Sequence, residues 1–402
     1  MIERYNLRWP SKKEVLDKLY CEWKPEIRTE TIAVENALGR IAAEEIRSVH
    51  NIPVVRASSM DGIAVRAAEL EAGNADTKNW KCGQDYVRAD TGDDFDDSYD
   101  TVIPIEGITI LPDGGVIILE NVNIKKGMNI RPRGSMLKEG DILVKQWTKL
   151  TPSDLAAIVM GGVTEIKVVK KPTVAFLPTG SELVPAGTKL TRGKNIDTNS
   201  ILVKNMLQEM GADPICYPIV EDNPDKLEQE LDNALEWSDV VIINGGSSKG
   251  GEDFNADLLK KKGKVICHNV SAAPGRPICV AVIDNKPVIN VPGPAIACFY
   301  SMDWCVRSVV DSLLHQAREQ RKTIQLKLSE DITYHAGMEI LCKMEINKTE
   351  DGYVGRQVPF RASTVAENLT APGVFITDPK AGCHPKDSVI EVELLREESE
   401  LK

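Results

Sequence analysis

Residues 240–253 have the sequence VVIINGGSSKGGED, in which four apolar β-branched residues run directly into a glycine-rich loop. A short apolar run bounded by glycine is typical of a strand buried on both faces. A helical pattern begins at Asn255, so the loop lies between a strand and a helix, where backbone N–H groups bind anions. The loop ends in Asp253, a carboxylate suited to a hard cation. The segment therefore predicts an α/β fold with an anion site at the end of a strand.

The sequence around this segment, from residue 172 to about residue 314, alternates short apolar runs with helical stretches. The expected strands are residues 173–177, 215–220, 240–243, 264–267, 278–283 and 287–291. The expected helices are residues 200–210, 225–237, 255–262 and 296–314. This alternation predicts a three-layer α/β domain with a mostly parallel sheet and with ligands at the carboxyl ends of the strands.

The rest of the chain follows other patterns. Residues 11–47 predict a helix, a strand at residues 29–34 and a second helix at residues 35–46, and Thr151 with Pro152 begins a further helix that runs to residue 160. Residues 53–145 are short alternating segments separated by Gly, Pro and Asp, and the chain beyond Arg321 again consists of strands and turns. The fold class is therefore multidomain, with α/β and β parts. We expect an N-terminal α+β domain (residues 1–47 and 147–171), an inserted β-rich domain (48–146), the α/β domain (172–320) and a C-terminal β domain (321–402).

The overall charge restricts the kind of ligand. The chain has 402 residues, a formal charge of −11 and a pI near 5.2. A basic face, which broad nucleic-acid binding needs, is not expected in such a chain. An anionic ligand must then be held locally, by backbone amides, by a few Lys or Arg side chains or by a bridging cation.

The cysteines and histidines bear on metals and on the compartment. Nine cysteines occur without a Cys-x-x-Cys pair, and five histidines lie far apart, which argues against a zinc site or a disulfide framework. The unpatterned cysteines fit a reducing compartment. The N-terminus has no signal-peptide pattern, and no apolar run approaches the ~18 residues of a membrane helix. We therefore expect a cytoplasmic protein without a membrane partner.

A second informative segment, SSMDGIAV at residues 58–65, lies far upstream. It places the Ser59 hydroxyl and the Asp61 carboxylate two residues apart, on one side of an extended chain just before Gly62. Together with the glycine-rich loop it predicts a site for a phosphorylated ligand and a metal, built from two distant parts of the chain.

Polar residues also follow several predicted strands of the α/β domain. These junctions are PTGSEL at residues 178–183, NIDTNS at residues 195–200, EDNP at residues 221–224 and the loop at residues 245–253. Each junction alone is also typical of a turn or a helix cap. Their shared position at strand ends favours a binding site.

In order and spacing these segments resemble the molybdopterin molybdenumtransferase family (MoeA and the gephyrin E domain), over nearly the whole chain. The motifs that carry the resemblance are ALGR at 37–40, SMDG at 59–62, TG at 91–92, GMNIR at 127–131 with Gly134, TGSEL at 179–183, DTN at 197–199, GGS at 245–247, PGRP at 274–277 and VPG at 291–293. The resemblance implies an elongated homodimer of four-domain protomers, with the active site between the molybdopterin-binding α/β domain of one protomer and the β domain of the other. It also implies insertion of molybdate into adenylylated molybdopterin with release of AMP and with a divalent cation, usually magnesium. Other proteins of molybdenum cofactor synthesis are further expected partners.

The resemblance also assigns roles to residues. Asp61 is the expected catalytic carboxylate, accompanied by Ser59 and Thr91, at the molybdate and the scissile bond. The residues expected to bind the molybdopterin compound are Thr179, Gly180, Ser181, Asn199, Gly245, Gly246, Ser247, Lys249, Pro274, Gly275, Arg276, Pro292 and Gly293. Glu182, Asp222 and Asp253 are expected to hold Mg²⁺ directly or through its waters, where the ion stabilises charge as the phosphoanhydride breaks.

The chain departs from the family pattern inside this site. Met136 stands where an acidic residue is usual, Ala273 replaces a lysine, Pro294 directly follows Pro292-Gly293, and Lys249 occupies a position where a small apolar residue is expected. A non-catalytic protein that binds or carries molybdopterin is therefore an alternative hypothesis. An adenylyltransferase for molybdopterin is another, although it does not explain the SMDG segment. Molybdate and tungstate have nearly the same size and charge, so the sequence does not distinguish them.

Overall fold

The computed structural model describes residues 9–71, 75–120, 122–245, 254–360 and 362–401. The chain forms two compact units, one made of Met1–Arg28 and Lys170–Lys402 and the other of Thr29–Val169. The finer division into four domains stays a prediction. No helix in the described ranges is long and apolar enough to cross a membrane.

The first unit contains the predicted α/β sheet, whose six strands have the order β15-β12-β16-β20-β19-β17. The strands are β12 (Thr173–Pro178), β15 (Asp213–Cys216), β16 (Val240–Asn244), β17 (Lys264–His268), β19 (Cys279–Ile283) and β20 (Lys286–Val291). The first four strands in this order are parallel, and β19 and β17 continue the sheet antiparallel. The prediction of a mostly parallel sheet is therefore confirmed.

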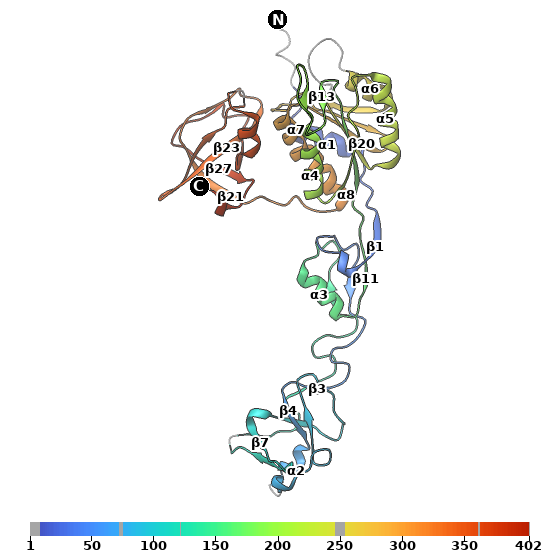
Figure 1. Ribbon diagram of the computed structural model, residues 1–402, viewed down its shortest axis with the longest axis vertical. Coiled ribbons are helices and arrows are strands. Elements are labelled where there is room, and N and C mark those ends of the chain that lie inside the picture. The colour runs from blue at the N-terminus through green and yellow to red at the C-terminus, as the bar shows by residue number, and fades with distance from the viewer. Residues whose placement is uncertain (1–8, 72–74, 121, 246–253, 361, 402) are drawn as a thin grey trace. The chain divides into compact units, whose positions relative to one another are not determined.

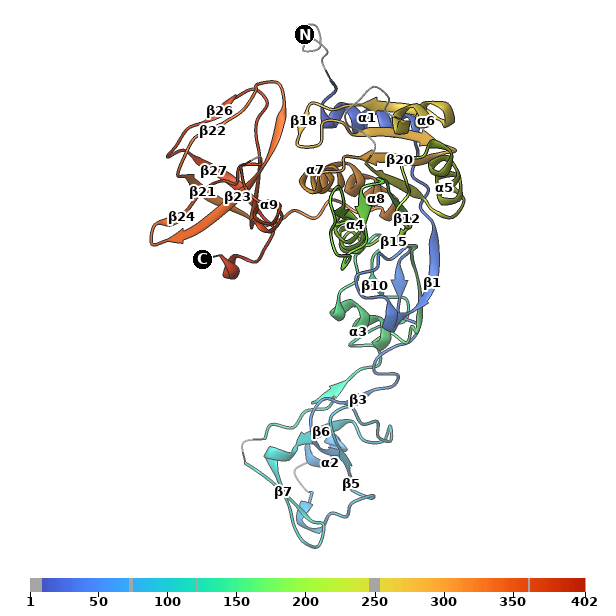
Figure 2. The same ribbon diagram turned by 45° about the horizontal axis from the view of Figure 1, so that its top comes forward.

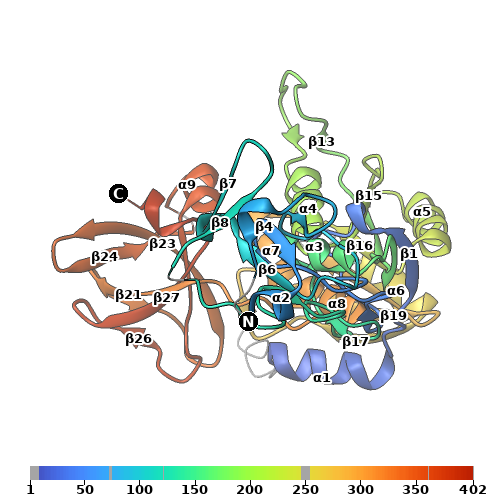
Figure 3. The same ribbon diagram turned by 90° about the horizontal axis from the view of Figure 1, so that it is seen from below.

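Helices cover both faces of this sheet (Figure 1). They are α1 (Lys12–Glu22), α4 (Asn199–Glu209), α5 (Pro224–Trp237), α6 (Phe254–Lys262), α7 (Ala295–Ser301) and α8 (Arg307–Leu314), with a π-helical segment at Met302–Val306 between the last two. Leu227 and Leu231 of α5 and Leu259 of α6 pack with Val241 and Ile243 of β16 in one apolar core. On the other face α4 and α7 lie against the parallel strands, and α1 lies beside β17 and β19 (Figure 3). Two short parallel strands, β13 (Leu183–Val184) and β14 (Asn195–Ile196), form a flap between β12 and α4.

The C-terminal part of the same unit is a small closed sheet. Its strands are β21 (Thr323–Leu328), β23 (Glu339–Thr349), β24 (Gly352–Gln357), β25 (Gly373–Ile376) and β27 (Val389–Leu394). Pairing runs β23-β24-β21-β27-β25 and returns to β23, which removes the free edges (Figure 2). The short strand β18 (Ala272–Ala273) pairs in parallel with the start of β23, and β22 (Ile332–Thr333) pairs with β26 (Cys383–His384). Helix α9 (Val365–Thr370) contacts α7. The expected β-rich C-terminal part is confirmed.

One part of the second unit surrounds a small mixed core. Strand β1 (Thr29–Ala33) pairs with β11 (Glu165–Val169), β2 (Ile46–Arg47) pairs with β10 (Ile142–Val144), and α3 (Pro152–Met160) begins at the predicted Thr151 cap. The predicted helix at residues 35–46 is wrong, since only a 3-10 turn at Val34–Asn36 forms there. Gly39 has a positive φ of 72° and its N–H donates to the Leu150 carbonyl, so this stretch pairs with residues 147–150 instead of coiling.

The other part of the second unit is built from short strands. Its central sheet has the antiparallel order β5-β4-β6, formed by Tyr86–Ala89, Gly62–Val65 and Thr101–Pro104. Strand β3 (Ala57–Ser58) pairs with β9 (Ile130–Arg131), β7 (Ile108–Ile110) pairs with β8 (Val116–Ile118), and a short helix α2 spans Ala67–Glu71. The expected β-rich inserted region is confirmed, and it presents the SMDG turn at the start of β4.

Candidate functional site

Two neighbouring parallel strands end in polar residues that bond directly to each other. Thr179 follows β12 and Asn244 ends β16, and both side chains are buried. The Thr179 N–H donates to the Asn244 carbonyl oxygen over 2.9 Å, and its hydroxyl donates to the same oxygen over 3.1 Å. The carboxyl ends of the two strands are thereby fixed side by side, at the edge of the sheet where α/β proteins bind ligands.

A buried amide pair extends this edge to the start of α4. The Asn199 side-chain amide donates to Asn244 Oδ1 over 2.8 Å and to the Gly293 carbonyl over 2.7 Å. The Asn244 amide in turn donates to the Pro292 carbonyl over 2.9 Å. These contacts bring together Asn199, Pro292 and Gly293, three residues that the family resemblance assigns to ligand binding. Asn199 Oδ1 is buried and accepts no hydrogen bond from the described residues, so it is an acceptor available to a ligand.

The turn at residues 180–182 forms a second polar group at the same strand ends. The Ser181 N–H donates to Asp222 Oδ2 over 3.0 Å, and the Asp222 N–H donates to Ser181 Oγ over 3.1 Å. Gly180 has a φ of 148°, and a Cβ atom there would lie 2.7 Å from a Glu182 carboxylate oxygen. The carboxyl groups of Glu182 and Asp222 therefore flank the same two residues, Gly180 and Ser181.

The glycine-rich loop is described only at its start. Gly245 has a φ of 114°, and a Cβ atom there would lie 2.7 Å from the Thr179 carbonyl oxygen, so only glycine fits. Its N–H donates to the Val291 carbonyl, and its own carbonyl accepts from the Asn255 amide over 2.9 Å. The predicted ligand residues Gly246, Ser247 and Lys249 and the predicted metal ligand Asp253 lie outside the described residues.

The predicted segment at residues 274–276 contacts other parts of the same unit. A Cβ atom on Gly275, which has a φ of 113°, would lie 3.2 Å from Ser301 Oγ and 3.3 Å from the Ala297 carbonyl, so this backbone passes close to α7. The Arg276 guanidinium lies 4.8 Å from the ring centre of Trp9. Its side chain is nevertheless exposed, which leaves the guanidinium N–H groups accessible to an anion. Pro274, after the cis peptide bond from Ala273, is half-buried.

In the second unit the SMDG turn meets the turn at Thr91. The Thr91 N–H donates to Asp61 Oδ1 over 2.6 Å, and the Ser59 N–H donates to the Asn129 carbonyl over 2.9 Å. The Thr91 backbone and side chain both bond to Asp61 and hold the pKa of this carboxyl below its ordinary value, and Arg88 adds to the effect. Asp61 is exposed and, with a lowered pKa, is ionised at neutral pH.

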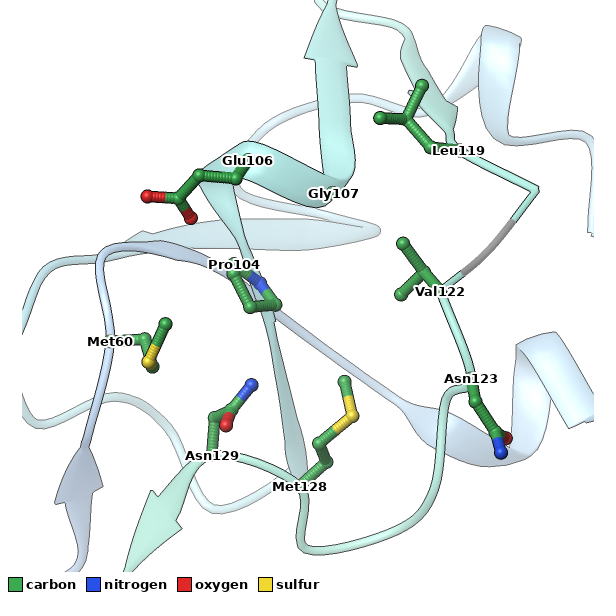
Figure 4. A pocket seen from close by; sticks show the side chains of 9 residues that line it. All are labelled: Met60, Pro104, Glu106, Gly107, Leu119, Val122, Asn123, Met128 and Asn129. Carbon is green, nitrogen blue, oxygen red and sulfur yellow. The ribbon is translucent and has the colours of Figure 1, made fainter.

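A cavity of about 460 Å³ adjoins this turn. The side chains of Met60, Met128 and Asn129 line one side of it, opposite Leu119 and Val122 (Figure 4). The mixed lining, together with the ionised Asp61 beside Met60, gives this face of the second unit both apolar and anionic character.

Met136, the departure from the acidic residue of the family, is exposed beside an arginine. Its Sδ accepts a hydrogen bond from Arg131 Nη1 over 3.2 Å. A thioether is a weak acceptor and carries no charge, so the positive charge of the Arg131 guanidinium is not neutralised by Met136.

Comparison with known proteins identifies the family. Residues 11–162 match the model of the MoeA N-terminal region (domain I and II), and residues 175–312 match that of a probable molybdopterin binding domain. A molybdopterin molybdenumtransferase from Haemophilus influenzae is 31% identical over 301 residues, which are 72% of this chain and 74% of that protein. The chain belongs to the molybdopterin molybdenumtransferase family. A second member, from Staphylococcus aureus (strain COL), is 28% identical over 75% of this chain and 76% of its own.

A solved structure supports the fold of the family. The structure titled molybdopterin biosynthesis moea protein from Pyrococcus horikosii has a TM-score of 0.79 and 24% identity, and covers 96% of this chain and 99% of its own. At this identity the likeness concerns the fold alone, and it confirms the predicted multidomain α/β and β architecture.

Two residues of the strand-end site were not among the predicted ligands. Asn244 links Thr179, Asn199 and Pro292, and its place at the end of an apolar strand was the signal that could have identified it. Lys194 Nζ donates to the Ser181 carbonyl over 2.7 Å, which puts a cation at the turn with Glu182 and Asp222. This contact depends on the β13–β14 flap, which sequence spacing does not reveal.

The structure allows a test of the donor set for magnesium. No group of three or more His, Cys, Asp or Glu side chains placed to hold a metal occurs within the described ranges. Glu182 and Asp222 provide two carboxylates around one turn, and Mg²⁺ in phosphate sites typically takes one or two carboxylates together with phosphate oxygens and water. The two carboxylates therefore fit an ion that a phosphorylated ligand helps to bind.

Proposed function

We propose that this protein is a molybdopterin molybdenumtransferase that inserts molybdate into adenylylated molybdopterin and releases AMP. Family membership supports the reaction class. Within the structure, the proposal rests on the polar residues at the strand ends. Asn199 is hydrogen-bonded there to Asn244 and Gly293, and Ser181 is hydrogen-bonded to Asp222. This arrangement offers a buried amide acceptor next to two carboxylates and a lysine.

The strand-end site divides into two parts with different chemistry. Asn199 Oδ1 is a buried acceptor without a partner in the described residues, and it suits the N–H groups of a pterin ring. Gly245 opens a loop between β16 and α6 of the kind that binds phosphate through backbone N–H groups. Lys194 and the exposed Arg276 would add positive charge for the pyrophosphate. We place the pterin near Asn199 and the phosphates near the loop.

Glu182 and Asp222 would hold the magnesium ion, with Asp253 as the further predicted ligand. When bound, the ion would neutralise the pyrophosphate and stabilise charge on the departing AMP. Ser181 fixes the Asp222 carboxylate through reciprocal hydrogen bonds, so one ligand is oriented before the ion arrives.

Asp61, with Ser59 and Thr91, would act on the oxyanion and the scissile bond. Because the Thr91 bonds lower its pKa, Asp61 is a poor proton acceptor at neutral pH. We therefore assign it an orienting role, in which its free oxygen accepts a hydrogen bond from an attacking water molecule and aligns the water with phosphorus; the phosphoanhydride bond then breaks, AMP leaves, and the proton of the water passes to solvent.

We further propose that the protein works as a homodimer in which the Asp61 turn of one protomer completes the site of the other. The support is the family resemblance and the two-part nature of the site. Mixed dimers of Asp61→Asn and Asp222→Asn protomers test this idea, because such a dimer retains one intact composite site. Recovery of about half the activity supports a site shared between protomers, and no recovery contradicts it.

The cytoplasmic location remains a prediction from the cysteine pattern.

The experiment that tests the function combines purified protein, adenylylated molybdopterin, molybdate and Mg²⁺, and follows AMP. Release of AMP that depends on both molybdate and Mg²⁺, and that falls in Asn199→Ala but not in the exposed control Asn205→Ala, supports the proposal. Tight binding of molybdopterin without AMP release would favour the non-catalytic alternative.

A further inference from the structure

A cavity of about 720 Å³ lies between the α/β sheet domain and the closed C-terminal sheet. None of its lining residues belongs to the strand-end site. Its apolar walls come from α4, α7 and the C-terminal part of the chain and consist of Leu202, Met206, Ile296, Phe299, Leu369, Ala371, Leu394 and Leu395. The volume and the apolar walls are those of a small-molecule pocket.

Lys343 gives this cavity its unusual chemistry. The residue lies on β23, where Cys342, Met344 and Ile346 belong to the core of the closed sheet. The alternation of a strand therefore directs Lys343 to the outer face of the sheet. It is nevertheless only 3% exposed, and the ring centre of Phe299, on α7, lies 4.9 Å from Lys343 Nζ.

The other cations of the cavity already have carboxylate partners. These ion pairs are Arg307 with Glu209 and Asp303, Arg321 with Asp303 and Glu393, Lys322 with Glu398, and Arg396 with Glu400. Within the described part of the chain the Lys343 ammonium has neither an ion pair nor a hydrogen bond, and its contact with Phe299 satisfies none of its three N–H donors. A largely buried ammonium without a protein acceptor is costly, and a ligand that supplied the acceptor would offset that cost.

We propose that this cavity binds a small amphipathic carboxylate, with the acid group on Lys343 and the apolar body along α4 and α7. Charge selects the head group, because the other four cationic side chains of the lining are already paired with carboxylates and only the Lys343 ammonium is left for a ligand among the described residues. A single unpaired ammonium matches a single negative charge. The apolar walls disfavour a fully hydrated ion such as inorganic phosphate.

The electrostatics of the cavity support this geometry. The pKa of Lys343 is lowered to about 8, mainly by burial and also by Arg321 and Arg396, while Asp303 opposes the shift. A bound carboxylate would raise this pKa again, because it would supply the acceptor and the countercharge that the empty cavity lacks.

Titration of the protein with octanoate, followed by calorimetry and ligand-detected NMR, tests the proposal. We expect saturable binding of octanoate at one site per chain, weaker binding of octan-1-ol and octylamine, and no competition by inorganic phosphate. Lys343→Met should weaken octanoate binding at least about 10-fold, the scale of a lost hydrogen bond between charged groups. Lys322→Met, which removes a lining lysine that is paired with Glu398, is the matched control and should change affinity less than about 3-fold.

A second variant keeps the test independent of Lys343. Leu202→Trp fills the cavity from α4 and should abolish binding while the ammonium remains. The proposal is overturned if wild-type protein does not bind octanoate, if Lys343→Met binds as well as wild type, or if Leu202→Trp has no effect. Tighter binding of octyl phosphate than of octanoate would overturn the carboxylate assignment.

Discussion

Replacement of Lys343 by methionine is expected to stabilise the protein at neutral pH. Burial, together with the nearby Arg321 and Arg396, lowers the pKa of Lys343 from 10.5 to about 8, and at about 1.4 kcal/mol per pKa unit the charged ammonium costs about 3 kcal/mol. The variant also loses the contact between the ammonium and the Phe299 ring, which is worth about 1–2 kcal/mol in a desolvated site. The expected net gain in the free energy of unfolding is therefore about 1–2 kcal/mol.

The gain must depend on pH in one direction. Because the folded pKa of Lys343 lies below the unfolded value, the unfolded chain binds more protons between these two pKa values, and the stability of the wild type rises with pH in this window. The cost of the buried charge is complete below the folded pKa of about 8 and disappears above the unfolded pKa of 10.5. The advantage of Lys343→Met should disappear over the same range.

Urea unfolding at about pH 7 and about pH 10.5, with hydrogen exchange in β21–β27 as the local probe, measures this difference. Lys327→Met is the control, because Lys327 is an exposed lysine on the same closed sheet, paired with Asp387, and its loss should change stability by less than about 0.5 kcal/mol. A Lys343→Met protein that is less stable than wild type at neutral pH would refute the reasoning. The same stability difference at both pH values would refute it as well.

Four further variants test other parts of the molecule. Glu182→Gln and Asp222→Asn should each lower kcat of AMP release at least about 100-fold with little change in molybdopterin affinity, because a cation matters most where charge develops in the transition state. Equal losses of rate and affinity would instead assign both residues to ligand binding. Met136→Asp should raise turnover in a steady-state AMP assay, because Arg131 is in place to neutralise the new carboxylate, and unchanged turnover would contradict this. Asp303→Asn should reduce the free energy of unfolding by about 3–5 kcal/mol, because it removes a buried carboxylate held by arginines. Although burial alone would raise the Asp303 pKa, these arginines lower it, so the stability contributed by Asp303 is lost as pH falls through that lowered pKa; unfolding midpoints equal to wild type at pH 7 would disprove its role.

Most strands of the α/β sheet were predictable because each is a short apolar run with a polar end, but the strand expected at residues 215–220 forms instead at Asp213–Cys216, which is largely exposed. The sequence located β16 and β20 to within one residue, and it identified the strand ends as the binding edge. The helix expected at residues 35–46 failed because helical spacing of apolar residues does not reveal a competing partner. In the structure Gly39 and Ala42 bond to residues 148–150, a non-local pairing that no local pattern contains.

Within the site, Thr179 and Ser181 follow β12 of the parallel sheet, whereas Asn199 begins α4 after the separate β13–β14 pair and reaches the same edge through its bonds to Asn244 and Gly293. The role of Asn244 was missed because a polar residue at the end of an apolar run also suits a simple strand terminus. The cavity at Lys343 could not be predicted either, since a lysine on the outer face of a strand is normally exposed. Its burial depends on packing between α7 and β23, which are distant in sequence.

The central claim is tested most directly by measuring AMP release and protein-bound molybdenum in the same reaction with adenylylated molybdopterin, molybdate and Mg²⁺. We expect AMP and molybdenum held by molybdopterin to appear in a 1:1 ratio, within about 20%, and both products to be lost together in Asp222→Asn, since magnesium-assisted cleavage and metal insertion are coupled. AMP release without molybdenum insertion, or molybdopterin binding without either product, would contradict it.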